Sequence, residues 1–165
     1  MWLYSMRTYL EIGLFFYFRR IHMIHLNNIP KDKPVLILPN HQNALLDALI
    51  IAVKGNRISY FLTRASAFHS PLIAKILKSY RMLPVYRIRD GIRTIKKNNE
   101  VFEACSELLN QNHSLVIFPE GNHNLKRTVR PLSKGFTRIV FDTLEKHPDL
   151  DLQLVPVGFN YKKPE

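Results

Sequence analysis

The sequence predicts a single α/β domain, with a mixed central sheet, flanking helices and an N-terminal amphipathic helix that associates with a membrane. Short apolar runs that suit buried strands alternate with longer segments whose apolar residues recur at helical spacing. The 165 residues are enough for one domain with a hydrophobic core, and 46% of them are apolar. No internal repeat or low-complexity tract suggests a second domain.

The first 18 residues form the predicted amphipathic helix. Large apolar and aromatic residues dominate it, Arg7 and Glu11 interrupt it, and two arginines close it. Its uninterrupted apolar run, residues 12–18, is far shorter than the roughly 20 residues that a membrane-spanning helix needs. We therefore expect residues 1–29 to form a helical segment at a membrane interface. Packing of this helix on the domain's own core is the alternative.

Strands and helices are expected to alternate over the rest of the chain. Apolar runs predict strands at 35–38, 58–62, 82–86, 114–118 and 152–159. Helices are expected from Ala44 to near Gly55, from Pro71 to Tyr80 and from about 92 to 109. A fourth helix is expected to follow Ser133 and to continue through 144. Asn43, Ser70 and Ser133 are the expected N-caps of the first, second and fourth helices. Pro156 predicts that the last strand lies at a sheet edge or an irregularity. The chain ends six residues after Phe159, which predicts a fragment of a longer protein.

Positive charge is the unusual feature of the composition. The formal net charge is +11 at pH 7, and eleven basic residues but one acid, Asp90, lie between Lys54 and Lys97. Such a block suits a phosphorylated substrate, an anionic membrane surface or nucleic acid. The single cysteine, Cys105, excludes an intramolecular disulfide, and its place in a helical apolar pattern predicts a buried thiol.

His41 and Asp47 are the first candidate catalytic residues. His41 follows the strand at 35–38 on a loop, whereas Asp47 falls in the first turns of the next helix. On one helix the two side chains would diverge, since each residue turns about 100°; with His41 outside the helix they can meet. A carboxylate bonded to one ring nitrogen fixes the histidine tautomer and stabilises the imidazolium. The alternative is a loop histidine beside an aspartate that favours the helix dipole.

Three further stretches follow predicted strands, where α/β folds gather their binding loops. Residues 83–90 contain two arginines that could grip a phosphate. Residues 118–123 place a glutamate and a glycine at a sharp turn, and residues 155–159 are apolar. Taken singly, these stretches read equally well as surface arginines, a turn glutamate and an edge strand.

Together, in this order, the stretches resemble the motifs of the glycerolipid acyltransferase family, which includes the lysophosphatidic acid and glycerol-3-phosphate acyltransferases. The resemblance covers roughly residues 17–160. The five residues between His41 and Asp47, one more than is commonest, and the pattern of Leu83–Asp90 resemble the glycerol-3-phosphate acyltransferase-like branch. The matching residues are Asn40-His41 with Asp47, Arg87, Phe118–Gly121, Lys134-Gly135 and Val155–Val157.

The resemblance implies a role for each of these residues within a catalytic domain spanning 30–165. It implies that His41 and Asp47 are catalytic, without a metal or a cofactor. Val155, Pro156 and Val157 would form the acyl-donor pocket. Many members carry Thr-Arg-Ser after the third motif, where this chain has Asn122-His123-Asn124, so that Arg127, Arg130 or Arg87 alone could bind the phosphate. The implied substrate-binding residues are Arg87, Arg89, Glu120, Gly121, Asn122, His123, Arg127, Arg130 and Lys134.

The implied activity is transfer of a fatty acyl group, in phospholipid synthesis, to a hydroxyl of glycerol 3-phosphate or 1-acyl-glycerol 3-phosphate. The co-substrate would be acyl-CoA or acyl carrier protein, and the partner an anionic membrane surface on its cytoplasmic face; no nucleic acid is expected. The alternatives are a phospholipid-dependent transacylase, a non-catalytic basic domain that binds membranes or nucleic acid, and a metal hydrolase using His41, Asp47, Glu120 and His123.

Overall fold

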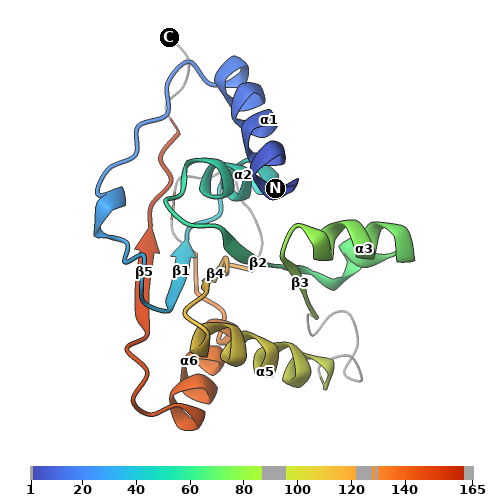
Figure 1. The fold of residues 1–165 in the computed structure, drawn as a ribbon, viewed down its shortest axis with the longest axis vertical. Helices are drawn as coiled ribbons and strands as arrows, with labels where there is room; N and C mark the ends of the chain where they lie inside the picture. Colours follow the sequence, from blue (N-terminus) through green and yellow to red (C-terminus); the bar gives the residue numbers. More distant parts are fainter. Residues whose placement is uncertain (1, 87–95, 122–127, 129, 162–165) are drawn as a thin grey trace.

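A five-stranded parallel sheet organises the computed structural model, which describes residues 2–86, 96–121, 128 and 130–161 (Figure 1). The strand order is β3-β2-β4-β1-β5. All four strand pairings are parallel, so the single α/β domain is confirmed and the prediction of a mixed sheet is wrong. The strands are β1 (Val35–Pro39), β2 (Ser59–Arg64), β3 (Met82–Val85), β4 (Ser114–Val116) and β5 (Gln153–Val157).

A helix in each connection makes the sheet parallel, because a crossover returns the chain to the edge from which the previous strand started. Pro156 lies on the edge strand β5, as expected. The helices and 3₁₀ turns are α1 (Trp2–Tyr17), η1 (Leu26–Asn28), α2 (Ala44–Lys54), η2 (Ala65–Phe68), α3 (Pro71–Ser79), α5 (Lys97–Asn110) and α6 (Gly135–Lys146).

The helix starts differ in detail from the prediction. Ser70 caps α3, where its hydroxyl accepts a hydrogen bond from the Ile73 amide. Lys134, not Ser133, holds the N-cap position of α6, and the Ser133 amide donates to the Pro119 carbonyl at 2.7 Å. Asn43 holds the N-cap position of α2 without a capping hydrogen bond from its side chain. Residues 92–95, expected to begin α5, lie outside the described residues.

Alternating strand residues fill a core on each face of the sheet. On one face, Leu36 and Leu115 pack against the α5 and α6 residues Phe102 and Ile139. On the other face, strand residues pack against α2. Each fully buried Leu or Ile contributes about 1.5–3 kcal/mol relative to an exposed side chain. Cys105 is fully buried in the α5 core, and burial raises the pKa of its thiol to about 12.

Helix α1 lies antiparallel against α2 on the outer side of this second face. Near its start, Arg7 donates to the carbonyls of Val53 and Gly55 at the end of α2, at 2.8 and 2.7 Å. Further along, the buried Leu14 packs against Ile50. None of the described helices is long and apolar enough to cross a membrane.

The sheet has a topological switch between β1 and β4. These strands are neighbours, yet β1 leads into α2 on one face and β4 leads toward α6 on the other. The loops after the two strands therefore diverge at the carboxyl edge of the sheet. Ligands of open α/β sheets bind in the crevice at such a point.

Candidate active site

The structure brings His41 and Asp47 together at the switch point. The His41 Nδ1 lies 2.9 Å from Asp47 Oδ2, although five residues separate them in the chain. His41 is on the loop after β1 and Asp47 is in the first turn of α2. Between them, Ala44 has φ 42°, a left-handed conformation that costs a non-glycine residue about 1–2 kcal/mol. This strained residue starts the helix directly after the loop that carries His41.

Asp47 is a fully buried carboxylate with three hydrogen-bond donors around it. Besides His41, the Asn43 amide donates at 2.8 Å and the Tyr161 hydroxyl at 2.5 Å. These charge-assisted bonds compensate the burial of a negative charge. Because Asp47 accepts at Nδ1, that nitrogen carries the imidazole proton, and Nε2 has the lone pair of a potential base.

Tyr161 belongs to this site, and the sequence reasoning missed it. Burial and the adjacent Asp47 carboxylate raise the pKa of the Tyr161 phenol, so that it remains a protonated donor. Its ring stacks on Phe159 and on Phe18, with centroids 6.1 and 6.0 Å apart. Phe18 follows α1 directly, so the end of this helix contacts the side chain that holds Asp47.

Asn40 positions the segment that carries Tyr161. Its side-chain amide donates to the Phe159 carbonyl at 3.2 Å, and the Phe159 amide donates back to Asn40 Oδ1 at 2.6 Å. These bonds extend the pairing of β1 with β5 beyond its last register pair, Pro39 with Val157. The role of Tyr161 could therefore be recognised only from the adjacency of β1 and β5, which the sequence alone does not show.

The Phe118–Gly121 turn forms the other wall of the site. The Phe118 ring lies over the His41 imidazole, with centroids 4.1 Å apart. The Glu120 side chain is only 3% exposed, and its Oε1 accepts a hydrogen bond from the His41 amide at 3.3 Å. Gly121 has φ 69°, which favours glycine, and its amide donates to the Phe118 carbonyl.

Arg130 is the predicted phosphate-binding arginine that the structure brings to this wall. Its Nε lies 4.0 Å from Glu120 Oε2, and its Nη2 donates to the Glu120 carbonyl at 3.4 Å. Lys134 is exposed at the start of α6. The other predicted substrate-binding residues lie outside the described part of the chain: Arg87, Arg89, Asn122, His123 and Arg127.

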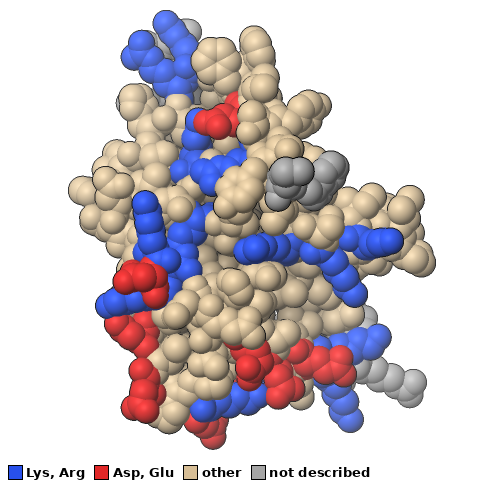
Figure 2. All heavy atoms as spheres, in the orientation of Figure 1, with Lys and Arg blue, Asp and Glu red and all other residues tan. Residues whose placement is uncertain are grey.

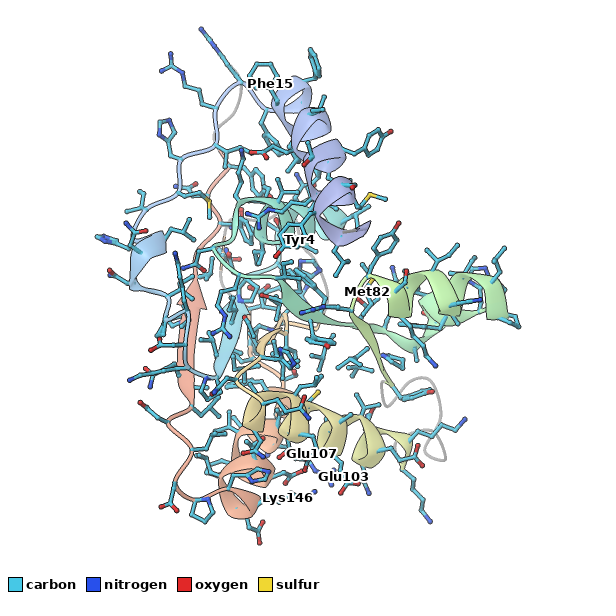
Figure 3. All side chains as sticks on the ribbon, viewed as in Figure 1. Tyr4, Phe15, Met82, Glu103, Glu107 and Lys146 are labelled. Atoms are coloured by element: carbon cyan, nitrogen blue, oxygen red, sulfur yellow. The ribbon has the colours of Figure 1, made fainter. Side chains whose placement is uncertain are left out.

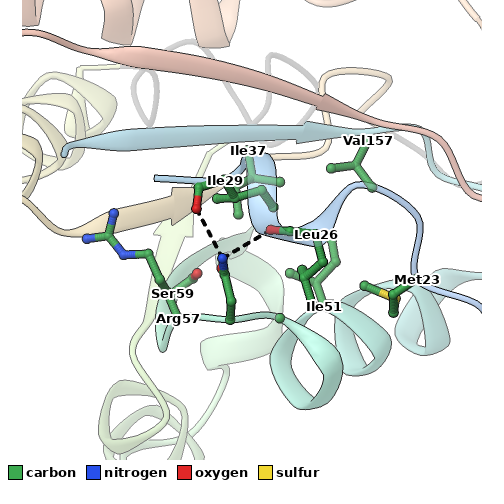
Figure 4. A pocket seen from close by; sticks show the side chains of 10 residues that line it. Met23, Leu26, Ile29, Ile37, Ile51, Arg57, Ser59 and Val157 are labelled. Carbon is green, nitrogen blue, oxygen red and sulfur yellow. Dashed lines mark hydrogen bonds between the residues drawn. The ribbon is translucent and has the colours of Figure 1, made fainter. Parts of the chain in front are cut away.

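The three residues expected to form an acyl-donor pocket lie on opposite sides of β5. Val155 and Val157 pack into the core on the α2 face, whereas Pro156 is exposed on the other side. Val157 also lines an apolar cavity of about 30 Å³ beside Leu26 and Ile51 (Figure 4). That volume suits about one water molecule. The acyl-donor pocket thus stays a prediction.

The described residues contain no group of three or more His, Cys, Asp or Glu side chains that could hold a metal ion. His41, Asp47 and Glu120 are bonded to one another or to neighbouring protein groups through the contacts given above. The arrangement these residues form is a buried carboxylate, a histidine oriented by it, and a second carboxylate with an arginine beside it. Such a set can move a proton next to a bound anion.

Comparisons with known proteins show which family this chain resembles. The acyltransferase family model matches residues 20–160. A probable 1-acyl-sn-glycerol-3-phosphate acyltransferase of Mycoplasma pneumoniae is 27% identical over 145 residues, which cover 82% of this chain and 51% of the relative. Glycerol-3-phosphate O-acyltransferase 1 of Saccharomyces cerevisiae is 34% identical over 64 residues, which cover 39% of this chain and 8% of the relative. The chain thus spans about half, or less, of these relatives.

The fold also matches a crystal structure of the 1-acyl-sn-glycerophosphate acyltransferase PlsC from Thermotoga maritima. The TM-score is 0.64 at 17% identity, and the match covers 94% of this chain and 65% of that one. The similarity supports the α/β architecture, while the family model carries the assignment over most of the sequence. The chain belongs to the glycerolipid acyltransferase family.

Proposed function

We propose that the protein transfers a fatty acyl group from acyl-CoA or acyl carrier protein to a hydroxyl of glycerol 3-phosphate or 1-acyl-glycerol 3-phosphate. The observation that carries this proposal is the His41–Asp47 pair at 2.9 Å, with Asp47 fully buried, in a chain of this family. The longer His–Asp spacing supports glycerol 3-phosphate as the first acceptor to test.

His41 acts as the general base in the proposed reaction. Its Nε2 removes the proton of the acceptor hydroxyl while the oxygen attacks the thioester carbonyl. The carbon–sulfur bond then breaks, an ester forms, and the proton passes from His41 to the leaving thiolate. Asp47 keeps the imidazole oriented and stabilises its charged form. The protein need not supply a nucleophile, because the acceptor hydroxyl is one; Cys105 is buried in the core with a raised pKa.

Glu120 and Arg130 form the proposed acceptor site. Glu120 holds the His41 amide and can accept hydrogen bonds from acceptor hydroxyls. Arg130 contacts Glu120 from the other side, at a position from which a guanidinium could bind the acceptor phosphate. Gly121 gives the turn the conformation that presents both groups. Arg87, Arg89, Asn122, His123, Arg127 and Lys134 complete the proposed substrate site.

Helix α1 is the proposed membrane contact. Its exposed large side chains are aromatic or aliphatic: Tyr4 63%, Tyr9 72%, Ile12 54%, Phe15 76% and Phe16 81%. The half-exposed Glu11 beside them is paired with Lys54. Figure 3 shows Tyr4 and Phe15 near opposite ends of the helix. A helix of 16 residues is about 24 Å long, and its aromatic face suits the interface of a bilayer. We place the protein on the cytoplasmic face of a membrane with anionic lipid.

Removal of the Tyr161 hydroxyl tests how Asp47 is held. In Tyr161→Phe we expect kcat to fall roughly tenfold, or about 1.4 kcal/mol, near the lower end for a hydrogen bond to a charged group. The phenyl ring retains its stacking, but the buried Asp47 carboxylate loses a donor, so the melting temperature should fall by a few degrees. Tyr9→Phe, on the exposed face of α1, is the matched control.

A thioester assay tests the proposed reaction. Thioester consumption should depend on glycerol 3-phosphate or its monoacyl form, and it should survive EDTA because no metal takes part. Ester formed from a phospholipid donor in the absence of thioester would indicate a transacylase instead. Salt-dependent nucleic-acid binding without any acyl transfer would contradict the proposal.

A further inference from the structure

An open basic hollow lies at the edge of the sheet opposite the candidate active site. Its volume is about 430 Å³. Lys31 precedes β1, Arg57 precedes β2 and Arg81 precedes β3, so that these three cations stand at the amino ends of parallel strands. Tyr4 and Arg7 of α1 line the side of the hollow that faces this helix. His41 and Glu120, by contrast, follow the carboxyl ends of β1 and β4.

The hollow is separate from the acceptor site of the proposed reaction. Helix α2 runs from Ala44, near Asp47, to Lys54, near the hollow, which is about 16 Å at 1.5 Å per residue. One glycerol phosphate is too short to place its hydroxyl at His41 and its phosphate in the hollow. Positive charge here therefore has no evident role in holding that acceptor.

Among the residues that the structure describes, four cations and no acid line this hollow. Arg7 donates to the carbonyls that end α2, and Arg57 donates to the carbonyls of Pro30 and Lys33. These contacts fix the two guanidinium groups without cancelling their net charge. Arg81 lies over the Tyr60 ring, 4.9 Å from its centroid. Figure 2 shows Lys and Arg side chains across the middle of this face, with most of its acidic side chains below them.

A neighbouring histidine responds to the same positive field. Burial and the charges of Arg81 and Arg57 lower the pKa of His113. The two arginines thus bring positive charge to the amino edge of the sheet, which Asp32 offsets in part at Arg57, in a chain whose net charge is +11. The Asn56 amide donates to the carbonyls of Leu26 and Ile29, so the four cations are the groups that an anion with several oxygen acceptors would meet in the hollow.

We propose that the hollow binds the phosphate of an anionic lipid headgroup. The argument for a lipid is continuity with α1, because Tyr4 both lines the hollow and belongs to the exposed aromatic face of that helix. A lipid whose chains lie beside this face can place its headgroup between Arg7, Lys31, Arg57 and Arg81. This inference rests on the proposed membrane contact of α1 but does not depend on acyl transfer.

Vesicle co-sedimentation tests the site with a charge-matched control. The Lys31→Gln/Arg81→Gln double variant should bind vesicles of phosphatidylcholine with phosphatidylglycerol about 25-fold more weakly than wild type, roughly fivefold per removed charge. The control Lys75→Gln/Lys78→Gln removes two charges from α3, outside the hollow, and should lose less than about threefold, because these lysines contribute only to the long-range field, which salt screens. Equal losses in both double variants would overturn a specific site. If Arg81→Gln prevents folding, Lys31→Glu alone provides the test, since Lys31 is exposed.

Two further arms identify the source of the phosphate and separate this inference from the proposed reaction. Inorganic phosphate or CoA that displaces the wild type from vesicles, but not the Lys31→Gln/Arg81→Gln variant, would assign the hollow to a soluble phosphate and overturn the lipid assignment. In detergent with soluble substrates, the hollow variants should retain wild-type turnover. His41→Ala should retain vesicle binding while it loses turnover. Loss of vesicle binding therefore does not imply loss of turnover, and loss of turnover does not imply loss of vesicle binding.

Discussion

His41→Ala is expected to reduce kcat for acyl transfer by about 10³-fold, within the range that a positioned general base contributes. Among the described residues, His41 is the histidine that a buried carboxylate, that of Asp47, orients beside the Phe118–Gly121 turn. Alanine removes the base but leaves Asp47, Tyr161 and Glu120 in place. The melting temperature should stay within a few degrees of wild type, because the His41 side chain is partly exposed.

Single-turnover and steady-state rates with one thioester donor measure this effect. KM for the acceptor should change far less than kcat, because His41 acts mainly in the transition state. His69→Ala is the matched control, since His69 is an exposed histidine after η2, and it should retain wild-type rates. Turnover of His41→Ala close to that of wild type would eliminate His41 as the base.

Asp47→Asn is expected to have the second-largest effect. Asp47 accepts hydrogen bonds from Asn43, His41 and Tyr161. A carboxamide offers only one oxygen and brings two N–H donors of its own, so at least one of the buried donors would face another donor. We expect the protein to lose roughly 1–3 kcal/mol of unfolding free energy, the usual cost of an unsatisfied buried group. The histidine tautomer would also be wrong, which should lower kcat by about 10³-fold.

Urea unfolding and kcat together check this expectation. Asp142→Asn is the matched control: Asp142 lies in an i,i+4 pair with Arg138 on the surface of α6, and its loss should change stability by less than about 0.5 kcal/mol. A folded Asp47→Asn enzyme with kcat within threefold of wild type would show that the carboxylate does not orient the base.

Most of the fold could be predicted from local patterns. Each of the five strands and each described helix lies where apolar periodicity placed it, and Pro156 falls on the edge strand. The parallel direction of the strands follows from the helix expected in each connection, which the prediction of a mixed sheet overlooked. The strand order and the face that each helix covers could not be predicted in this way: α5 and α6 cover the face opposite α2, where Leu36 and Leu115 contact Phe102 and Ile139. Local spacing does not contain that information.

The same limit applies to the site. His41, Asp47 and Glu120 could be named because their motifs are short and each follows a strand. Tyr161 could not, because its bond to Asp47 spans 114 positions in the chain and requires β5 to lie beside β1. The location of a site for the anionic partner was similarly ambiguous from the sequence. The sequence predicted an anionic partner, but only the fold separates Arg130, at the carboxyl edge beside Glu120, from Arg57 and Arg81 at the amino edge.

The central claim is that this chain joins an acyl thioester to a glycerol-phosphate hydroxyl. A panel of donors and acceptors, with the full-length protein in membranes and the products identified by mass spectrometry, tests it most directly. We predict a new ester of glycerol 3-phosphate or 1-acyl-glycerol 3-phosphate, with release of one free thiol per ester, and no ester above background with His41→Ala. Correctly folded, membrane-bound wild type that forms no ester with any acceptor of the panel would contradict the claim.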